Sequence, residues 1–529
     1  MIQKPFKSLS DIPLRLLSCL LLFVLGCGTE RPPNVIVFLV DDLGWKDTGV
    51  YGSTFYETPN INRLACEGVR FTQAYAASPV CSPTRASLMT GRHPARLHIT
   101  NWIGGKENRL LRQADYEHAL PLNETTIGES FKAANYSTAY FGKWHLGMDG
   151  FRPDDQGFTY VRSVNNAGQP GSYFPPYRQA NFPAADVPDL HDDPDGTYLT
   201  DRLTDLTIEY LKSRRDSTFF LVLSHYAVHT PLQAPDSLTG KYNRKRSNLP
   251  PPDTPEFIPE SNLGRTKTRQ DRSDYAAMIE SVDQSIGRLL TALREFQLTS
   301  NTIIVFVSDN GGLSTLRGNA QWAATSNSPL RAGKGLLYEG GIRIPLIIWY
   351  PTHIPAGNTV DTPVTTNDLV PTLLDLADLP EHPVDGVSLV PVFGTLPLAE
   401  RALYWHFPHY HGSGNRPSGA IRKGDWKLIE WFEDGRLELY DLATDLSETT
   451  NLAETMPAKA AELQQALHDW HIAVNARMPT PNPDWIVTGH MSSSQANTVS
   501  ALPKITLESP TNSPGPRVLS LGTKPRRQR

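Results

Sequence analysis

Acidic and amide residues follow two strongly apolar segments of the chain, the runs 34–40 and 302–307. In open α/β sheets, ligands gather at the carboxyl ends of the strands. Carboxylate and amide oxygens are the ligands that Ca²⁺ and Mg²⁺ prefer. A pair of this kind is also typical of a turn, but two pairs after two buried runs favour a divalent-cation site, with Ca²⁺ expected first and Mg²⁺ second. The four side chains are Asp41, Asp42, Asp309 and Asn310.

A cysteine opens the segment CSPTRASLMTGR, which covers residues 81–92. A lone cysteine is usually a small buried hydrophobic residue. Here Pro83 and Gly91 predict a helix over 82–91. Cys81 therefore lies at the start of a helix, where free backbone N–H groups and the helix dipole attract anions.

The N-terminal residues are typical of an export signal, which we assign to residues 1–26. Basic residues precede the apolar run 16–25, which is too short to span a bilayer. The run ends in VLGC and resembles a bacterial lipoprotein box, with Cys27 as the lipidated residue. An ordinary cleaved signal with an incidental cysteine is the alternative. We expect an exported protein, in the periplasm or at the cell surface, that touches the membrane only through a lipid anchor.

Apolar runs and helical patterns alternate along most of the remaining chain. Residues 273–296 carry an apolar stripe at helical spacing, whereas 151–194 and 248–264 are rich in Pro, Gly and polar residues and predict long loops. The alternation predicts one large α/β domain over 34–400, with a mostly parallel sheet flanked by helices. The expected strands are 34–40, 69–76, 219–226, 302–307 and 342–350.

The pattern changes towards the C-terminus. Short strands such as 426–431 precede a helix that we expect over 457–477, so residues 401–490 predict a smaller α+β subdomain. Residues 491–529 are rich in Ser, Thr and Pro and end in basic residues. We expect this basic tail to be disordered.

Composition narrows the class of protein. Hydrophobic residues are 39% and charged residues 20% of the chain, which excludes disorder throughout. The net charge is −5 although both ends are basic, so the body of the chain is more acidic still. An acidic body argues against a nucleic-acid partner.

Several motifs resemble those of the type I sulfatases, which depend on formylglycine, and they occur along the chain in the order typical of that family. The pattern C-x-P-x-R at 81–85, followed by LMTGR, resembles the segment whose cysteine is oxidised to Cα-formylglycine. NVIVFLVDDLGW at 34–45 resembles the family's opening strand, and YSTAYFGKWHLG at 136–147 resembles its second signature. The chain is similar to the arylsulfatase A-like group of bacterial carbohydrate sulfatases. This resemblance implies an alkaline-phosphatase-like fold with a large mixed sheet.

The resemblance also implies a mechanism. Hydrated formylglycine at position 81 has one hydroxyl that attacks sulfur and a second whose deprotonation expels sulfate. A maturation enzyme is then a required partner, and residue 81 completes the shell of the cation. The resemblance implies that Arg85 orients the hydrate and that Lys143 and Lys334 bind sulfate oxygens. It also implies that His145 is the base and that His229 donates a proton to the leaving oxygen.

The segment 404–411 is dense in histidine and aromatic residues. It is open to three interpretations, which are a zinc cluster, a sugar-binding rim and packing between subdomains. We expect substrate recognition, with further help from the segment after the Cys81 helix. The expected substrate-binding residues are His406, His409, His411 and Trp102, with His98 and Asn101 on weaker grounds.

The expected activity is hydrolysis of sulfate esters on a sulfated polysaccharide or oligosaccharide, with galactose or N-acetylgalactosamine sulfate as the expected unit. Two other functions stay open. One is a related phosphodiester or phosphonate hydrolase, which shares fold and metal chemistry. The other is a non-catalytic protein that binds sulfated glycans, if Cys81 is unmodified.

Overall fold

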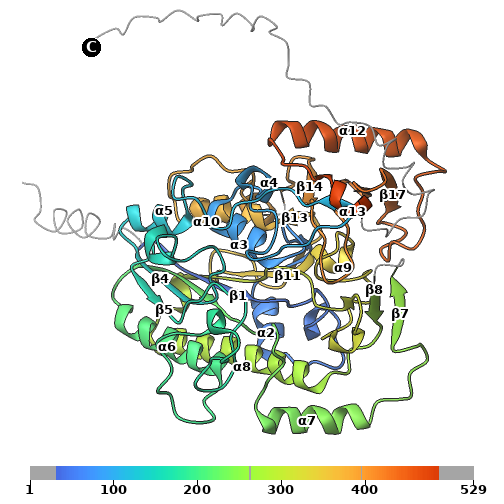
Figure 1. Cartoon of the computed structure of the whole chain (residues 1–529). Helices are drawn as coiled ribbons and strands as arrows, with labels where there is room; N and C mark the ends of the chain where they lie inside the picture. The colour runs from blue at the N-terminus through green and yellow to red at the C-terminus, as the bar shows by residue number, and fades with distance from the viewer. Residues whose placement is uncertain (1–30, 261–263, 395, 488–529) are drawn as a thin grey trace, which may run out of the picture. The chain divides into compact units, whose positions relative to one another are not determined.

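The computed structural model describes residues 31–260, 264–394 and 396–487, and its centre is a large mixed sheet between helices (Figure 1). The signal segment 1–26, Cys27 and the tail 491–529 lie outside the described residues. The strand order is β12 (Asn358–Val360), β2 (Val69–Tyr75), β11 (Arg343–Trp349), β9 (Thr302–Ser308), β1 (Asn34–Val40), β6 (Phe219–Ser224), β4 (Ser137–Gly142) and β5 (Tyr160–Arg162), with β13 (Val364–Thr365) also beside β2.

Most strand pairs in this sheet are parallel. β1 runs parallel to both β6 and β9, and β4 runs parallel to β5 and β6. Within the described sheet, β11 is the strand that runs antiparallel to its neighbours, β2 and β9. The predicted α/β class with a mostly parallel sheet is confirmed.

Helices cover both faces of the sheet because both faces of the central strands are apolar. In β1, Ile36 and Phe38 belong to one core cluster, and Val35 and Val37 belong to the other. This alternation follows the two-residue period of a strand. The first cluster contains residues of α2 (Pro59–Glu67), α6 (Leu199–Arg214), α7 (Asp236–Ser247) and α8 (Ser273–Glu295), and the second contains residues of α3 (Cys81–Thr90), α4 (Pro94–Leu97), α5 (Ile127–Ala133), α10 (Leu369–Leu376) and α11 (Val390–Phe393).

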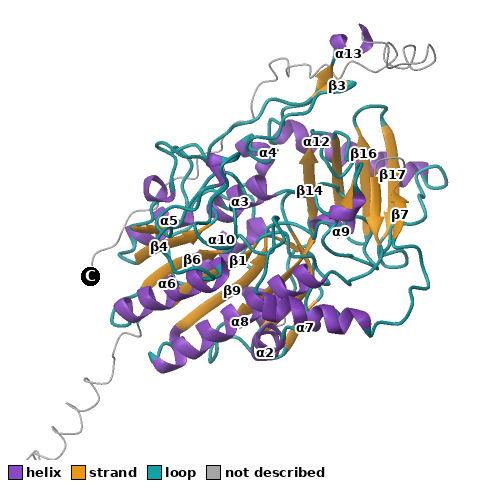
Figure 2. Ribbon diagram, turned by 60° about the horizontal axis from the view of Figure 1, so that its bottom comes forward, coloured by secondary structure: helices purple, strands orange, loops and turns teal. Residues whose placement is uncertain are grey.

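A second, antiparallel sheet follows towards the C-terminus (Figure 2). Its order is β14 (Ala402–Phe407), β15 (Ser418–Lys423), β16 (Trp426–Trp431) and β17 (Arg436–Asp441). Leu463 and Leu467 of α12 (Pro457–Ala473) pack on Ile421 and Leu428 of this sheet. The predicted helix is thus present, but it ends at Ala473 rather than at residue 477.

Smaller elements complete the described chain. The prediction of loop throughout 248–264 is wrong, because β7 (Phe257–Glu260) pairs with β8 (Gly264–Lys267). The described residues between 31 and 482 form one compact unit, and α13 (Pro483–Val487) belongs to another. No helix of the described ranges is long and apolar enough to cross a membrane. The remaining elements are β3 (Leu111–Arg112), which pairs with β18 (Thr480–Pro481), β10 (Thr315–Leu316), which pairs with β8, and α9 (Glu339–Ile342).

Gly142 ends β4 and lets the chain turn towards Lys143, whose N–H donates to the Ser224 carbonyl at 2.9 Å. Its φ is +87°, and a Cβ at this position would lie 2.0 Å from the same carbonyl oxygen. We expect Gly142→Ala to lower the free energy of unfolding by about 3 kcal/mol, because both the backbone angle and the clash oppose the methyl group.

Urea unfolding of the two variants Gly142→Ala and Gly150→Ala measures this difference. Gly150 has a similar φ of +98° but nothing within 4 Å of the added Cβ. It should lose about 1 kcal/mol from the backbone angle alone. Equal losses in the two variants would show that the close approach to β6 carries no cost.

Candidate active site

The predicted acidic group forms at the carboxyl ends of two neighbouring parallel strands. Asp41 and Asp42 follow β1, and Asp309 and Asn310 follow β9, so the strand pairing brings them together. The Asp42 N–H donates to Asp309 Oδ1 at 3.1 Å, and Asn310 Nδ2 donates to Asp42 Oδ1 at 2.9 Å. Asp41, Asp42 and Asp309 each offer a carboxylate oxygen, and these atoms lie within 4.8 Å of one another.

Buried basic side chains balance the three carboxylates. The ion pairs are Lys143 Nζ with Asp41 Oδ2 at 2.6 Å, Lys334 Nζ with Asp42 Oδ1 at 2.7 Å, and Arg85 Nη2 with Asp309 Oδ2 at 2.8 Å. Burial raises the pKa of Asp41 well above its usual value, and the neighbouring Asp309 adds to this. Burial acts the same way on Asp42, but the ammonium group of Lys334 together with the other nearby basic side chains outweighs it and lowers the pKa of that carboxyl. Such buried charges are stable only together.

Two oxygens in this group have no hydrogen-bond partner although they are buried. They are Asp41 Oδ1 and Asn310 Oδ1. A buried acceptor without a partner is costly, and a divalent cation would satisfy both atoms at once. Oxygen donors of this kind suit Ca²⁺ or Mg²⁺. The residues present therefore fit the cation that the sequence predicts.

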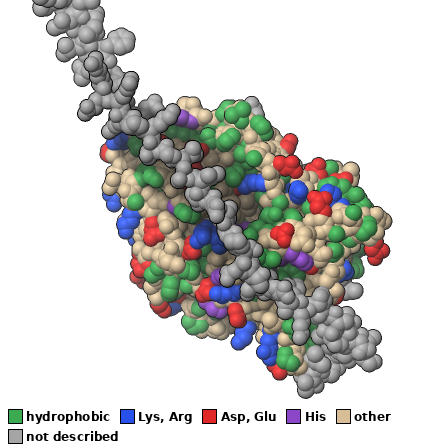
Figure 3. All heavy atoms as spheres, turned by 90° about the horizontal axis from the view of Figure 1, so that it is seen from above, with side chains coloured by type: hydrophobic (Ala, Val, Ile, Leu, Met, Phe, Trp, Pro, Cys, Tyr) green, Lys and Arg blue, Asp and Glu red, His purple; other side chains and the backbone are tan. Residues whose placement is uncertain are grey.

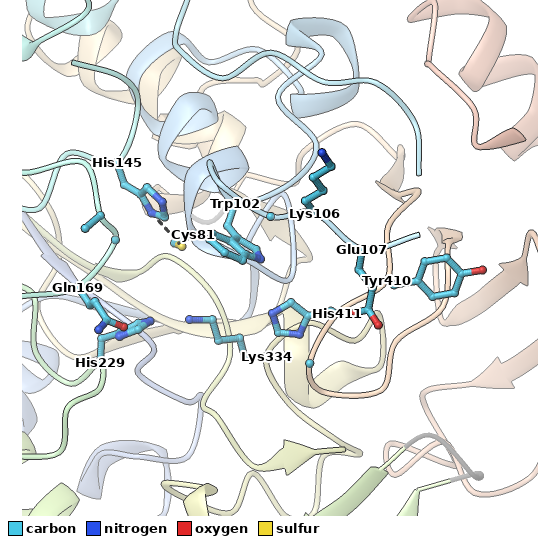
Figure 4. Close-up of a pocket in the computed structure, with 14 residues that line it drawn as sticks. Cys81, Trp102, Lys106, Glu107, His145, Gln169, His229, Lys334, Tyr410 and His411 are labelled. Carbon is cyan, nitrogen blue, oxygen red and sulfur yellow. Dashed lines mark hydrogen bonds between the residues drawn. The ribbon is translucent and has the colours of Figure 1, made fainter. Parts of the chain in front are cut away.

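Cys81 is the first residue of α3 and lies beside His145 (Figure 4). Its Sγ is 3.3 Å from His145 Nδ1, and its side chain is only 3% exposed. Burial raises the pKa of the Cys81 thiol, so the unmodified residue is a neutral thiol at neutral pH. Because the thiolate is the nucleophilic form, an unmodified Cys81 is a poor nucleophile.

The hydrogen bonds of His145 fix which ring nitrogen faces residue 81. Its Nε2 lies 3.2 Å from the Ile103 carbonyl oxygen, which can only accept, so Nε2 carries the proton. Burial, reinforced by Lys143, lowers the pKa of His145 well below its usual value and keeps the ring neutral. Nδ1 therefore points an unprotonated lone pair at residue 81, as a base on that residue requires.

Arg85 ties the elements around residue 81 together. Its guanidinium group donates to the Lys143 carbonyl at 2.8 Å and to Ser224 Oγ at 2.7 Å, and its Nε donates to Asp309 at 2.9 Å. One buried side chain thus holds α3, the residue after β4 and the ends of β6 and β9 in a fixed arrangement.

His229 faces the same group from the other side. Its Nε2 lies 3.7 Å from Asp42 Oδ2, and its Nδ1 lies 2.9 Å from the Thr230 carbonyl oxygen, to which it donates. Burial, helped by the charge of Lys334, lowers the pKa of His229 to about 3. The neutral ring thus presents an unprotonated Nε2, which must take up a proton before it can donate one.

Four of these residues line one cavity of about 330 Å³ (Figure 4), a size typical of ligand sites. Cys81, His145, His229 and Lys334 form one end of the lining, whereas Lys143 is fully buried beneath it. The rest of the wall consists largely of loop residues. Of these, the sequence predicted Trp102 and His411 by name and Tyr410 as part of the segment 404–411, and it missed Lys106, Glu107 and Gln169.

Two of the predicted substrate-binding histidines do not reach the cavity. His406 is 3% exposed, donates to the Arg477 carbonyl at 2.9 Å and packs against His471 of α12. His409 is fully buried, and its Nε2 lies 2.8 Å from Thr100 Oγ1. The prediction for these two is wrong, because α12 and the segment after α4 cover them.

The structure supports neither the weaker substrate-binding candidates nor the zinc interpretation. His98 caps α4, and Asn101 is buried and accepts a hydrogen bond from the Trp102 N–H. Neither lines the cavity. Within the described ranges, the potential metal-binding group of acidic, histidine or cysteine residues is the aspartate trio and not the histidines.

On the face shown in Figure 3, Lys and Arg side chains are interspersed with Asp and Glu rather than gathered in one basic patch.

Comparisons with known proteins identify the family. A family model described as Sulfatase matches residues 33–379, and one described as N-sulphoglucosamine sulphohydrolase, C-terminal, matches residues 332–475. A protein named sulfatase from Formosa agariphila is 32% identical over 529 aligned residues, covering 84% of this chain and 90% of that protein. N-acetylgalactosamine-6-sulfatase from Sus scrofa is 33% identical and covers 72% of this chain and 69% of its own.

A solved structure shows the same architecture. The crystal structure of Ps i-CgsB has a TM-score of 0.69 and 28% sequence identity, and the match covers 83% of this chain and 93% of that chain. The family match spans most of the described residues, including both strand ends, residue 81 and Lys334. The chain belongs to the sulfatase family and is a sulfuric ester hydrolase.

Proposed function

We propose that this protein hydrolyses sulfate esters of a sulfated carbohydrate and that residue 81 acts as formylglycine. The observation that carries the proposal is the unprotonated His145 Nδ1, aimed at a residue 81 that is inert as a thiol. Hydrated formylglycine replaces this thiol by two hydroxyl groups, one to attack sulfur and one to lose its proton to a base. His145 is that base.

The charged residues around position 81 bind the sulfate group. A Ca²⁺ or Mg²⁺ ion held by Asp41, Asp42, Asp309 and Asn310 supplies positive charge for the sulfate oxygens and for residue 81. Lys334 borders the cavity, so its ammonium group can bind a sulfate oxygen as well as Asp42. Lys143 pairs with Asp41 below the cavity, and its contact with sulfate stays a prediction.

Burial of Cys81 supports a maturation partner that acts early. Every residue of α3 is buried, so the folded chain offers Cys81 to no second protein. The oxidising enzyme must therefore meet residues 81–92 while they are unfolded, which for an exported chain means before folding is complete. Export and a lipid anchor at Cys27 are part of the same proposal.

The substrate class follows from the cavity wall and from the relatives. Trp102 is 36% exposed at the cavity and offers an aromatic face to a sugar ring. One relative is named N-acetylgalactosamine-6-sulfatase, and a structure of Ps i-CgsB, at 27% identity, is described as a complex with k-i-k-neocarrahexaose. We therefore favour a galactose or N-acetylgalactosamine sulfate, within a polysaccharide or an oligosaccharide.

Sulfate release from N-acetylgalactosamine 6-sulfate and galactose 6-sulfate tests the proposal directly. We expect sulfate by ion chromatography, and faster turnover of 4-nitrophenyl sulfate than of the matching phosphate diester or phosphonate monoester. Preference for either phosphorus ester would identify a related phosphoester hydrolase instead. Binding of the sulfated sugars without any turnover would indicate a non-catalytic binding protein.

Replacing His229 with alanine tests its role as proton donor. We expect kcat/KM for a sulfated sugar to fall by about 10²-fold or more, because a sugar alkoxide needs a proton as it leaves. 4-Nitrophenolate leaves without one, so 4-nitrophenyl sulfate should be affected far less. The exposed His353, in a loop away from the cavity, gives the control variant His353→Ala. Equal losses on both substrates would assign His229 to sulfate binding.

A further inference from the structure

The cavity has a second end, which is formed by loops and contains Glu107 and His411. These two residues lie on the far side of Lys334 from His229 (Figure 4). The ring of His411 lies directly against the residue after Lys334, since a Cβ on Gly335 would be 2.0 Å from His411 Nδ1. Glu107 is near enough for its charge to act on the His411 ring. Both side chains therefore line the same cavity as Lys334 and residue 81.

Glu107 is fixed through one of its two carboxylate oxygens. Oε1 accepts hydrogen bonds from Arg109 Nε at 2.7 Å and from Arg317 Nη2 at 3.0 Å. Oε2 has no hydrogen-bond partner among the described residues. Two arginines on one oxygen hold the carboxylate in place, so Oε2 is a fixed acceptor at the edge of the cavity.

His411 supplies the complementary donor. The backbone N–H of Ser413 donates to His411 Nδ1 at 3.1 Å, so the neutral ring carries its proton on Nε2. Burial, with the charge of Lys334 next in effect, lowers the pKa of His411 to about 4 and keeps the ring neutral at neutral pH. In the described part of the chain, Nε2 has no acceptor. Its N–H group is thus available to a ligand in the cavity.

We propose that Glu107 Oε2 and His411 Nε2–H form an acceptor–donor pair that binds free hydroxyl groups of the sugar unit carrying the sulfate ester. A hydroxyl group donates and accepts at once, so one or two neighbouring hydroxyls satisfy both atoms. A second sulfate at that position cannot donate to Glu107 and adds a negative charge beside its carboxylate. The pair therefore selects sugars that are unsubstituted next to the scissile ester. This inference rests on the proposed sulfatase function.

The experiment compares kcat/KM for 4-nitrophenyl sulfate with that for N-acetylgalactosamine 6-sulfate, galactose 6-sulfate and glucosamine 6-sulfate. Glu107→Gln keeps the shape of the side chain and removes its charge. We expect it to lower kcat/KM for the best sugar about 10- to 100-fold and to leave the aryl sulfate within about twofold of wild type. Asp115→Asn removes an equal charge from the loop that follows β3, outside this cavity, and should leave kcat/KM for both substrates unchanged.

Deoxy analogues of the best sugar identify the hydroxyl group. Loss of the hydroxyl that contacts Glu107 should lower kcat/KM strongly for the wild type and hardly at all for Glu107→Gln, as a double-mutant cycle requires. Equal losses of Glu107→Gln on sugar and aryl sulfate would overturn the proposal, and so would no loss on either. Cleavage of the sugars without a selective loss in Glu107→Gln overturns this inference alone. A wild type that cleaves the aryl sulfate but no sugar overturns both this inference and the proposed carbohydrate substrate. A wild type that cleaves none of the four sulfates overturns the proposed function.

Discussion

Cys81→Ser is expected to abolish turnover while leaving the fold in place. Without formylglycine, position 81 has a single hydroxyl group. No second hydroxyl is then present to lose its proton to His145 and expel sulfate, so the reaction cycle cannot be completed. Removal of a catalytic nucleophile typically costs about 10⁴-fold or more in kcat. The side chain is small and lies at the start of a helix, so the thermal midpoint should change little. Activity on 4-nitrophenyl sulfate and thermal unfolding are the two measurements.

Cys66→Ser is the matched control, because Cys66 is also a free cysteine but is exposed. It should retain full activity. Mass spectrometry of the peptide that contains residue 81 should show a mass corresponding to formylglycine in wild type and serine in Cys81→Ser. Wild-type activity in Cys81→Ser, made in a host that cannot oxidise serine, would falsify the assignment of residue 81 as the nucleophile.

Removal of the divalent cation is expected to lower stability and activity together. An ion that binds the folded state alone stabilises it by about 2.7 kcal/mol at a hundredfold excess over Kd. Its loss also leaves Asp41 Oδ1 and Asn310 Oδ1 buried without a partner. We therefore expect EDTA to lower the thermal midpoint, and Ca²⁺, with Mg²⁺ second, to restore both midpoint and turnover. Elemental analysis should find one ion per chain before chelation.

Two variants separate this effect from the loss of any buried acid. In Asp309→Asn the difference between midpoints with Ca²⁺ and with EDTA should vanish. In Asp283→Asn, which removes a buried carboxylate that accepts from backbone N–H groups of α2, the difference should persist. An unchanged midpoint on chelation of metal-loaded wild type would exclude a structural cation at the strand ends.

The strand ends could be predicted because their signal is local. An apolar run followed at once by two acidic or amide residues indicates a buried strand and the position of its end, as at Val40 and Asp41. The pairing of parallel strands then brings distant pairs together without further information. Lys143 and His145, by contrast, stand in no pattern that physics alone would single out, and only the resemblance to a family motif pointed to them.

The loop side of the cavity could not be predicted in the same way. Glu107 and His411 lie about 300 positions apart in loops, where no periodicity indicates which residues will meet. The errors at His406 and His409 have a related cause. Both belong to a segment rich in histidine and aromatic residues. Whether such a segment lies at a cavity or is covered depends on α12, about 50 positions further along, and on the segment after α4, about 300 positions earlier.

The cavity is built from two kinds of structure. Its sulfate end rests on β1, β9, the start of α3 and the residues after β4, where a substitution disturbs the core of the sheet. Its other end consists of the loops around residues 102–107 and 410–412, which lie outside the strands and helices of the large sheet. Mutations can therefore accumulate in these loops while the reaction centre stays intact. Over evolutionary time, one chemistry can be retargeted from one sugar to the next by loop changes alone.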